Sequence, residues 1–224
     1  MIRKQHPFWG SLSPLGGLSG IGLLVMASTR LAWAITVAGG LFWVYILSVL
    51  ASVFLTSGTC KKIFPQSGRA PIFTCISYFW GSAYILLLWL LCPFAAMEVF
   101  FPLLLIPLFC TDSSIFSRIV SQESALMTAG NTDLGEAVFD AASEAAVLAL
   151  LLVFISLIRE PLSFCCLSLP GTYKGIMTFI SFKGNERFPM QIFAGSAGAL
   201  LLLGYIIGLY YFFRNTQAPA EGIK

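Results

Sequence analysis

The sequence predicts an all-α polytopic membrane protein with six transmembrane helices, arranged as two inverted three-helix repeats whose first and fourth helices are broken. Of its 224 residues, 58% are hydrophobic and only 10% are charged, and the mean hydropathy is +0.87. Soluble domains carry about 25% charged residues, so this composition excludes an ordinary soluble domain. We expect one integral membrane domain over residues 1–224, with repeats at about 12–92 and 93–213.

The first half begins with a short segment, residues 14–29, that is apolar but rich in glycine. Such an interrupted segment favours a broken or re-entrant helix over a plain span. A signal peptide is the alternative, because Ala32 and Ala34 follow the apolar run in A-x-A order. However, Arg30 splits the run and the next span starts at once, which favours the helix.

The plain spans are expected at residues 31–55, 70–92, 134–158 and 191–213. Each is long enough to cross about 30 Å of hydrocarbon. The fourth apolar segment in chain order, residues 101–110, is short and is broken by Pro102 and Pro107. We expect residues 159–189 to form a loop. The glycines of the last span suit close helix packing.

Two short, interrupted segments therefore stand at corresponding places in the two halves, one at residues 14–29 and one at residues 101–110. This arrangement is typical of an inverted repeat, in which discontinuous helices meet near the midplane of the bilayer. The simpler alternative is a pair of kinked helices.

Three carboxylates mark the start of the fifth predicted span. Glu136, Asp140 and Glu144 recur every four residues, which places them on one face of a helix. A charge inside a membrane helix costs about 2.5–3.5 kcal/mol, so such residues usually face a protein interior or a wet cavity. The stripe therefore predicts a pathway for sodium ions or protons. Alternatively, Glu136 and Asp140 form an ordinary acidic helix start in the headgroup layer.

The Lys and Arg residues are distributed unequally between alternate loops. With six spans, one side of the membrane holds Arg3, Lys4, Lys61, Lys62, Arg69, Arg118, Arg214 and Lys224. The other side holds Arg30, Arg159, Lys174, Lys183 and Arg187. Because cytoplasmic loops carry the excess of Lys and Arg, both termini are expected in the cytoplasm.

Other kinds of chemistry have little support in the sequence. The net charge is only +3 and the basic residues are dispersed, so nothing points to nucleic acid. One histidine, His6, argues against most metal and triad sites. The six cysteines show no CxxC or Cys/His spacing and are mostly expected to pack as small apolar residues. For the adjacent Cys165 and Cys166, a vicinal disulfide and a lipid attachment are alternatives to plain packing.

Several short motifs together resemble the membrane subunits of the Rnf and Nqr complexes. They are RAPIF from Arg69, FPL from Phe101, FD from Phe139, IRE from Ile158 and AGA from Ala197. The resemblance covers most of residues 12–213. RnfE/NqrD fits better than its paralogue RnfA/NqrE, because it shares the cytoplasmic N-terminus and the glycine-rich sixth span.

The resemblance implies a subunit of a redox-driven ion pump that is not an enzyme alone. Rnf passes electrons from ferredoxin to NAD, and Nqr passes them from NADH to quinone, while sodium or protons cross the bacterial inner membrane. An RnfE-like subunit pairs with an RnfA/NqrE-like paralogue of opposite orientation. Cysteines in the broken helices of both subunits hold a shared two-iron two-sulfur cluster. The implied partners are the other subunits of the complex and the lipid bilayer.

The chain departs from the family at the cluster positions. Ile21 stands where the first-span cysteine falls, and Leu108 stands where the fourth-span cysteine falls. Cys110 is the nearby thiol, and it would be an iron ligand only if the broken helix were shifted. The acidic residue of the family's third span is also replaced, near Ile85, whereas Asp140 matches a family aspartate. The resemblance thus leaves the cluster without matched ligands.

We therefore expect a membrane subunit of an Rnf/Nqr-type pump, with its ion pathway at Glu136, Asp140 and Glu144. The alternative is a stand-alone, cation-coupled secondary transporter whose midplane site contains Asp140 and Glu144. A structural assembly subunit without chemistry of its own is a third hypothesis.

Overall fold

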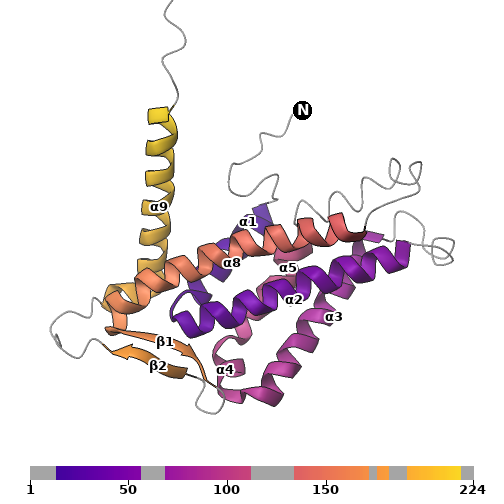
Figure 1. Cartoon of the computed structure of the whole chain (residues 1–224), viewed down its shortest axis with the longest axis horizontal. Helices are drawn as coiled ribbons and strands as arrows, with labels where there is room; N and C mark the ends of the chain where they lie inside the picture. Colours follow the sequence, from indigo (N-terminus) through magenta and orange to yellow (C-terminus); the bar gives the residue numbers. More distant parts are fainter. Residues whose placement is uncertain (1–13, 57–68, 112–133, 172–175, 182–190, 218–224) are drawn as a thin grey trace, which may run out of the picture.

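A computed structural model describes residues 14–56, 69–111, 134–171, 176–181 and 191–217 of the chain. Three long helices lie side by side, and three short helices pack against them (Figure 1). A two-stranded β-hairpin lies at one end of this bundle, and the last helix extends away from the same end.

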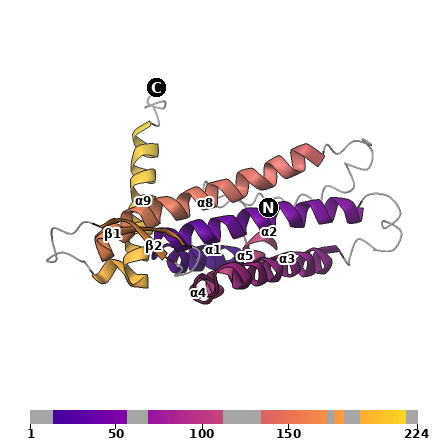
Figure 2. The same ribbon diagram turned by 60° about the horizontal axis from the view of Figure 1, so that its bottom comes forward.

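The long helices are α2 (Leu31–Thr56), α3 (Arg69–Leu91) and α8 (Leu134–Phe164). They have 26, 23 and 31 residues, which at 1.5 Å per residue gives lengths of about 39, 35 and 47 Å. α2 packs between α8 and α3 (Figure 2). Each of the three contains a stretch that is long and apolar enough to cross a membrane.

The short helices are α1 (Pro14–Ala27), α4 (Pro93–Glu98) and α5 (Phe100–Thr111). α1 has 14 residues and α5 has 12, so each is only about 20 Å long and cannot cross the hydrocarbon core alone. The two pack against each other. α5 runs without interruption through Pro102 and Pro107, so the break predicted at these prolines is absent; Val99 separates α5 from the short helix α4. α1 is likewise short but continuous.

Glycines allow α3 to approach α5 and α2 closely. A Cβ added at Gly81 would lie 2.6 Å from Cγ of Pro107, which sits inside α5. A Cβ at Gly40 would lie 2.9 Å from Cε1 of Tyr84. The Tyr84 hydroxyl donates a hydrogen bond to the Thr36 carbonyl at 2.8 Å. A tyrosine ring therefore fills the space beside Gly40, and α3 is fixed along α2.

The segment at residues 159–189, predicted to be a loop, contains regular structure, and the fold is mostly helical rather than all-α. α8 continues past Pro161 to Phe164. Cys165 has a φ of 50°, and this left-handed residue ends the helix and turns the chain. The strands β1 (Cys166–Pro170) and β2 (Ile176–Ser181) then pair antiparallel. Pattern reasoning missed the hairpin because its alternating residues are nearly all apolar.

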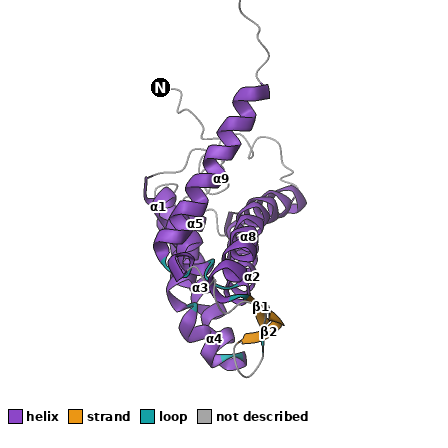
Figure 3. Ribbon diagram, turned by 90° about the vertical axis from the view of Figure 1, so that its left-hand side faces the viewer, coloured by secondary structure: helices purple, strands orange, loops and turns teal. Residues whose placement is uncertain are grey.

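The last helix, α9 (Ser196–Gln217), follows a 3-10 turn, η3 (Gln191–Phe193). It contacts α1 and α8 and then extends out of the bundle at a steep angle to α8 (Figure 3). Gly198 is tightly packed, since an added Cβ would lie 2.4 Å from Cα of Phe193. Gly204 has nothing within 4 Å of such an atom. The predicted close packing of small residues therefore holds at the start of α9 only.

Apolar side chains fill the centre of the bundle and also cover its outside. The interior is formed by fully buried residues of α1, α2, α5 and α8, among them Leu24, Leu41, Ile106 and Leu152. On the outer surface, Leu90 of α3 is 85% exposed and Leu150 of α8 is 70% exposed. Large exposed apolar surfaces mark contacts with a membrane or another protein. The structure thus has three helices able to span a membrane and an outside suited to lipid.

Candidate functional site

The carboxylates of the predicted ion pathway lie in the first third of α8, and the helix itself is as predicted. Their surroundings differ. Asp140 is exposed, whereas Glu144, one turn later, is half-buried. Ala141 and Ala145, the residues after each of them, are fully buried. The side chain of Glu136 lies outside the described residues. The stripe therefore does not face the interior as a whole, and only Glu144 lies at its edge.

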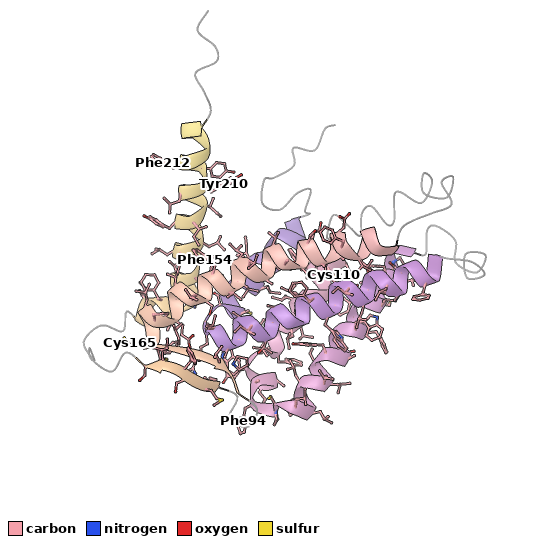
Figure 4. The ribbon with its side chains drawn as sticks, in the orientation of Figure 1. Phe94, Cys110, Phe154, Cys165, Tyr210 and Phe212 are labelled. Atoms are coloured by element: carbon pink, nitrogen blue, oxygen red, sulfur yellow. The ribbon has the colours of Figure 1, made fainter. Side chains whose placement is uncertain are left out.

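Cys110 of α5 lies beside two buried serines, Ser48 of α2 and Ser77 of α3. Glu144 of α8 lies near enough for its charge to reach this thiol. Ser48 and Ser77 are fully buried and Cys110 is 1% exposed. Figure 4 shows Cys110 between the ribbons of α8 and α2. We call Ser48, Ser77, Cys110 and Glu144 the polar cluster.

The two serines of the polar cluster differ in their hydrogen bonds. Ser77 Oγ donates to the carbonyl of Phe73, one turn earlier, at 3.0 Å. Ser48 Oγ makes no hydrogen bond of ordinary geometry, although it lies beside the Cys110 thiol. Elsewhere on the same helix, Ser52 Oγ donates to the Val49 carbonyl at 2.7 Å. Hydroxyl and carboxylate oxygens of this kind can accept a proton donor or coordinate a hard cation.

The residues at the predicted cluster positions do not fit a two-iron two-sulfur cluster. Ile21 is 37% exposed on α1 and Leu108 is half-buried on α5, and both are hydrocarbon side chains. Cys110 is buried among serines and offers one thiol, whereas such a cluster takes four ligands. In the part of the chain that the structure describes, no three His, Cys, Asp or Glu side chains are grouped to hold a metal ion.

A second charged site lies near the end of α8, where Arg159 and Glu160 stand next to each other in the IRE motif from Ile158. Arg159 is 1% exposed and Glu160 is fully buried. All five N–H groups of a guanidinium can donate, and here each one does, over distances of 2.5 to 3.0 Å. The acceptors are the carbonyls of Val25, Phe193, Ala194 and Gly195 and the hydroxyl of Ser28.

Glu160 makes a separate set of bonds. Its Oε2 accepts from the backbone N–H of Leu31 at 2.9 Å and of Ser168 at 3.1 Å. Its Oε1 accepts from the Ser168 hydroxyl at 2.5 Å. The carboxylate therefore caps the start of α2, which suits the positive end of the helix dipole, and holds β1 against it.

The two side chains therefore act as a structural anchor. Arg159 joins α8 to the end of α1 and to the η3–α9 connection, while Glu160 joins it to α2 and β1. Among the described contacts, Arg159 and Glu160 do not bond each other. Each side chain has its own set of hydrogen-bond partners. The sequence signal was the IRE motif from Ile158, but its importance depends on contacts more than a hundred residues away.

Cys165 and Cys166 are free, half-buried thiols. Burial raises the pKa of the Cys166 thiol, and the Glu160 carboxylate adds to this rise while Arg30 partly opposes it. Arg30 itself lies over the Phe164 ring, 4.9 Å from its centroid. This arrangement keeps Cys166 protonated at neutral pH, which agrees with plain packing better than with a reactive thiol.

No model of a known protein family matches this chain, and no curated protein matches it. The likeness to Rnf and Nqr subunits is therefore a hypothesis based on short motifs. The function proposed below is therefore based mainly on the residues of the site.

Proposed function

We propose that this chain is a membrane subunit of a redox-driven sodium or proton pump of the Rnf/Nqr type, and that it supplies part of the ion pathway. The observation that carries the proposal is Glu144, a half-buried carboxylate on the apolar helix α8, followed directly by the fully buried Ala145. Ionisable residues inside membrane helices are costly, so they usually mark an ion route.

The packing of the helices supports the two-repeat part of the proposal. α1 contacts α5, and α2 contacts α8. α3 contacts α2 and α5, while α9 contacts α8 and α1. Exchanging α1 with α5, α2 with α8 and α3 with α9 leaves these contacts unchanged, as expected of two repeats related by a twofold axis. The match is partial, because α2 also packs against α5 and, in the described part of the chain, no comparable packing joins α8 to α1. In this proposal α1, α5 and α9 also lie in the membrane, giving six segments with both termini in the cytoplasm.

The redox part of the proposal is based on the resemblance alone. Because Ile21 and Leu108 cannot bind iron, the electron carrier would be held by partners, above all by an RnfA/NqrE-like paralogue. This chain would then support electron transfer by holding those partners in the inner membrane while ions pass through it.

The missing thiols also favour a second candidate. With hydrocarbon side chains at Ile21 and Leu108, the same helices could serve a stand-alone, cation-coupled secondary transporter. Glu144 would then bind the coupling cation in a protein that carries no electrons.

Purification from native membranes tests the proposal. The chain would be tagged at its C-terminus, extracted in mild detergent, and assayed for co-purifying proteins, iron and flavin. We expect flavin- and NADH- or ferredoxin-binding subunits in the eluate, and none with an unrelated tagged membrane protein. A chain that elutes alone, without iron or flavin, would reject the pump and leave the transporter.

A further inference from the structure

We propose that the hairpin of β1 and β2 is a membrane-interface element. Its outer face contacts the acyl chains of one leaflet, while its backbone stays at the level of the lipid headgroups. This inference goes beyond the proposed function, because it holds for a pump and for a transporter alike. It needs only a membrane, which three helices of this chain are long and apolar enough to cross.

The outer face of the hairpin is apolar. Ser168 of β1 is fully buried and its hydroxyl donates to Glu160, so this residue points toward the bundle. Neighbouring residues of a strand point to opposite faces of a sheet, and paired residues share a face. Leu169 and its partner Met177 therefore point away from the bundle. Both side chains are exposed, that of Met177 by 65%.

A β-bulge extends this apolar face. The register shifts between Leu167 and Ser168, where β2 has one residue more than β1, namely Phe179. Because of this extra residue, Met177 and Ile180 lie on the same face although they are three residues apart. Ile180 is exposed and Phe179 is 70% exposed. Three large apolar side chains of β2 are thus exposed together.

Hydrogen bonds fix the hairpin against the ends of the long helices. Glu160 Oε2 accepts from the N–H groups of Ser168 in β1 and of Leu31, the first residue of α2. The Cys92 thiol, directly after α3, donates to the carbonyl of Gly171, directly after β1, at 3.4 Å. α8 leads into β1 almost directly. The hairpin therefore lies where one end of each long helix is found (Figure 1).

The apolar surface of the bundle continues to the hairpin. The stretches able to cross a membrane have one end each at this level, at Leu31 in α2, Leu91 in α3 and Phe164 in α8. Leu91 and Phe164 are exposed. A hairpin in this position lies where the three helices leave the hydrocarbon core, and lipid that covers the helices also reaches the hairpin.

The free edge of β2 limits the depth of the hairpin and the kind of partner it fits. In the described part of the chain, the sheet has two strands, so β2 pairs with β1 alone. Hydrocarbon cannot satisfy the N–H and C=O groups of a free edge, which keeps the backbone among the headgroups. The bulge at Phe179 disfavours pairing with a strand of a second chain. Apolar side chains of interfacial elements still reach about 5–10 Å into the boundary with the acyl chains.

Tryptophan fluorescence tests the depth of the hairpin. Phe179→Trp would be made in the full chain in lipid nanodiscs, and the signal of the parent chain, which has five tryptophans, subtracted. Lipids brominated near the headgroups quench a shallow indole, lipids brominated near the chain ends quench a deep one, and iodide in the buffer quenches one in water. We expect the shallow bromines to quench the introduced indole several-fold more strongly than the deep bromines or iodide.

Leu150→Trp is the matched control. Leu150 is also 70% exposed, but it lies on α8, fourteen residues before Phe164, about 21 Å along the helix. The deep bromines should quench its indole more strongly than the shallow ones. Met177→Trp is a second probe of the same face if the change at Phe179 prevents folding.

Three results would each overturn the proposal. Strongest quenching by iodide would place the hairpin in water, and strongest quenching by the deep bromines would place it inside the hydrocarbon core. Weak quenching by all three would show that protein, a second copy or another subunit, covers the hairpin. The proposed function is tested separately by the proteins that co-purify with the chain, so either proposal can fail without the other.

Discussion

The two ends of α8 bury charge in opposite ways. Near its C-terminus, Arg159 and Glu160 are almost completely buried, and every donor of the guanidinium and both carboxylate oxygens have partners. Near its N-terminus, Asp140 is exposed and Glu144 is half-buried. The charges at the C-terminal end are enclosed by their hydrogen-bond partners, whereas those at the N-terminal end reach the surface.

This difference separates a structural role from a functional one. A buried charge whose hydrogen bonds are all made costs little in place but is expensive to disturb. A carboxylate that reaches the surface can exchange ions with its surroundings without breaking the fold. We therefore assign the anchor to Arg159 and Glu160 and keep Glu144 as the residue of the proposed ion pathway.

Replacing Arg159 should have the largest effect. Arg159→Met removes five donors and leaves the carbonyls of Phe193, Ala194 and Gly195 without their partner. Each buried acceptor left unpaired costs about 1–3 kcal/mol. We expect little folded protein, measured as the monodisperse fraction after detergent extraction.

Arg30→Met is the control for this variant. Arg30 is half-buried and lies over the Phe164 ring. Such a cation–π contact stabilises a fold by about 0.5–1 kcal/mol. Its yield should remain close to that of the parent chain. Equal yields of the Arg159 and Arg30 variants would show that the anchor does not stabilise the fold.

Two substitutions of Glu160 separate the effect of its charge from that of its hydrogen bonds. Glu160→Ala leaves the N–H groups of Leu31 and Ser168 unpaired, at about 1–3 kcal/mol each. Glu160→Gln keeps one oxygen for both N–H groups, and its amide can donate to the Ser168 hydroxyl, so it should be much milder. The apparent Tm at a fixed heating rate should fall in the order parent, Gln, Ala. A Gln variant as unstable as the Ala variant would mean that the charge, not the hydrogen bonds, matters at this position.

The sequence was sufficient to predict the parts of the fold that depend on local pattern. The apolar runs gave α2, α3 and α8 to within a few residues at most ends, and the spacing of Asp140 and Glu144 gave a helix there. The hairpin was missed, because strands with apolar residues on both faces carry no alternation. The end of α8 was missed because Pro161 normally favours a helix end nearby.

The candidate site was predictable only in part. Spacing placed Glu136, Asp140 and Glu144 on one face, but it could not show that Asp140 is exposed while Glu144 approaches the interior. Ser48, Ser77 and Cys110 are unremarkable in sequence and come together only through the packing of α2, α3 and α5. The partners of Arg159 lie 134 residues before it, at Val25, and 34 residues after it, at Phe193, which no local pattern encodes.

Gly198 links the anchor to α9 and should show a smaller effect. An alanine there would meet the backbone of Ile192 and Phe193, the latter a partner of Arg159, so η3 must shift. Gly204 on the same helix has open space around it. We expect Gly198→Ala to lower the apparent Tm by several degrees. Gly204→Ala should leave it unchanged or raise it slightly, because alanine favours a helix by about 0.5–1 kcal/mol. Similar changes of apparent Tm in both variants would contradict the tight packing of Gly198 against η3.

The smallest effect should come from Asp140, the carboxylate one turn before Glu144. Asp140 is exposed, so its charge is screened and can attract cations to the start of α8 without holding one. Asp140→Asn should therefore slow sodium or proton uptake by membrane vesicles by no more than about twofold at 0.15 M ionic strength, whereas Glu144→Gln should slow it much more. The effect of Asp140→Asn should grow when the ionic strength is lowered. Uptake lost as completely in Asp140→Asn as in Glu144→Gln would place both carboxylates on the ion pathway.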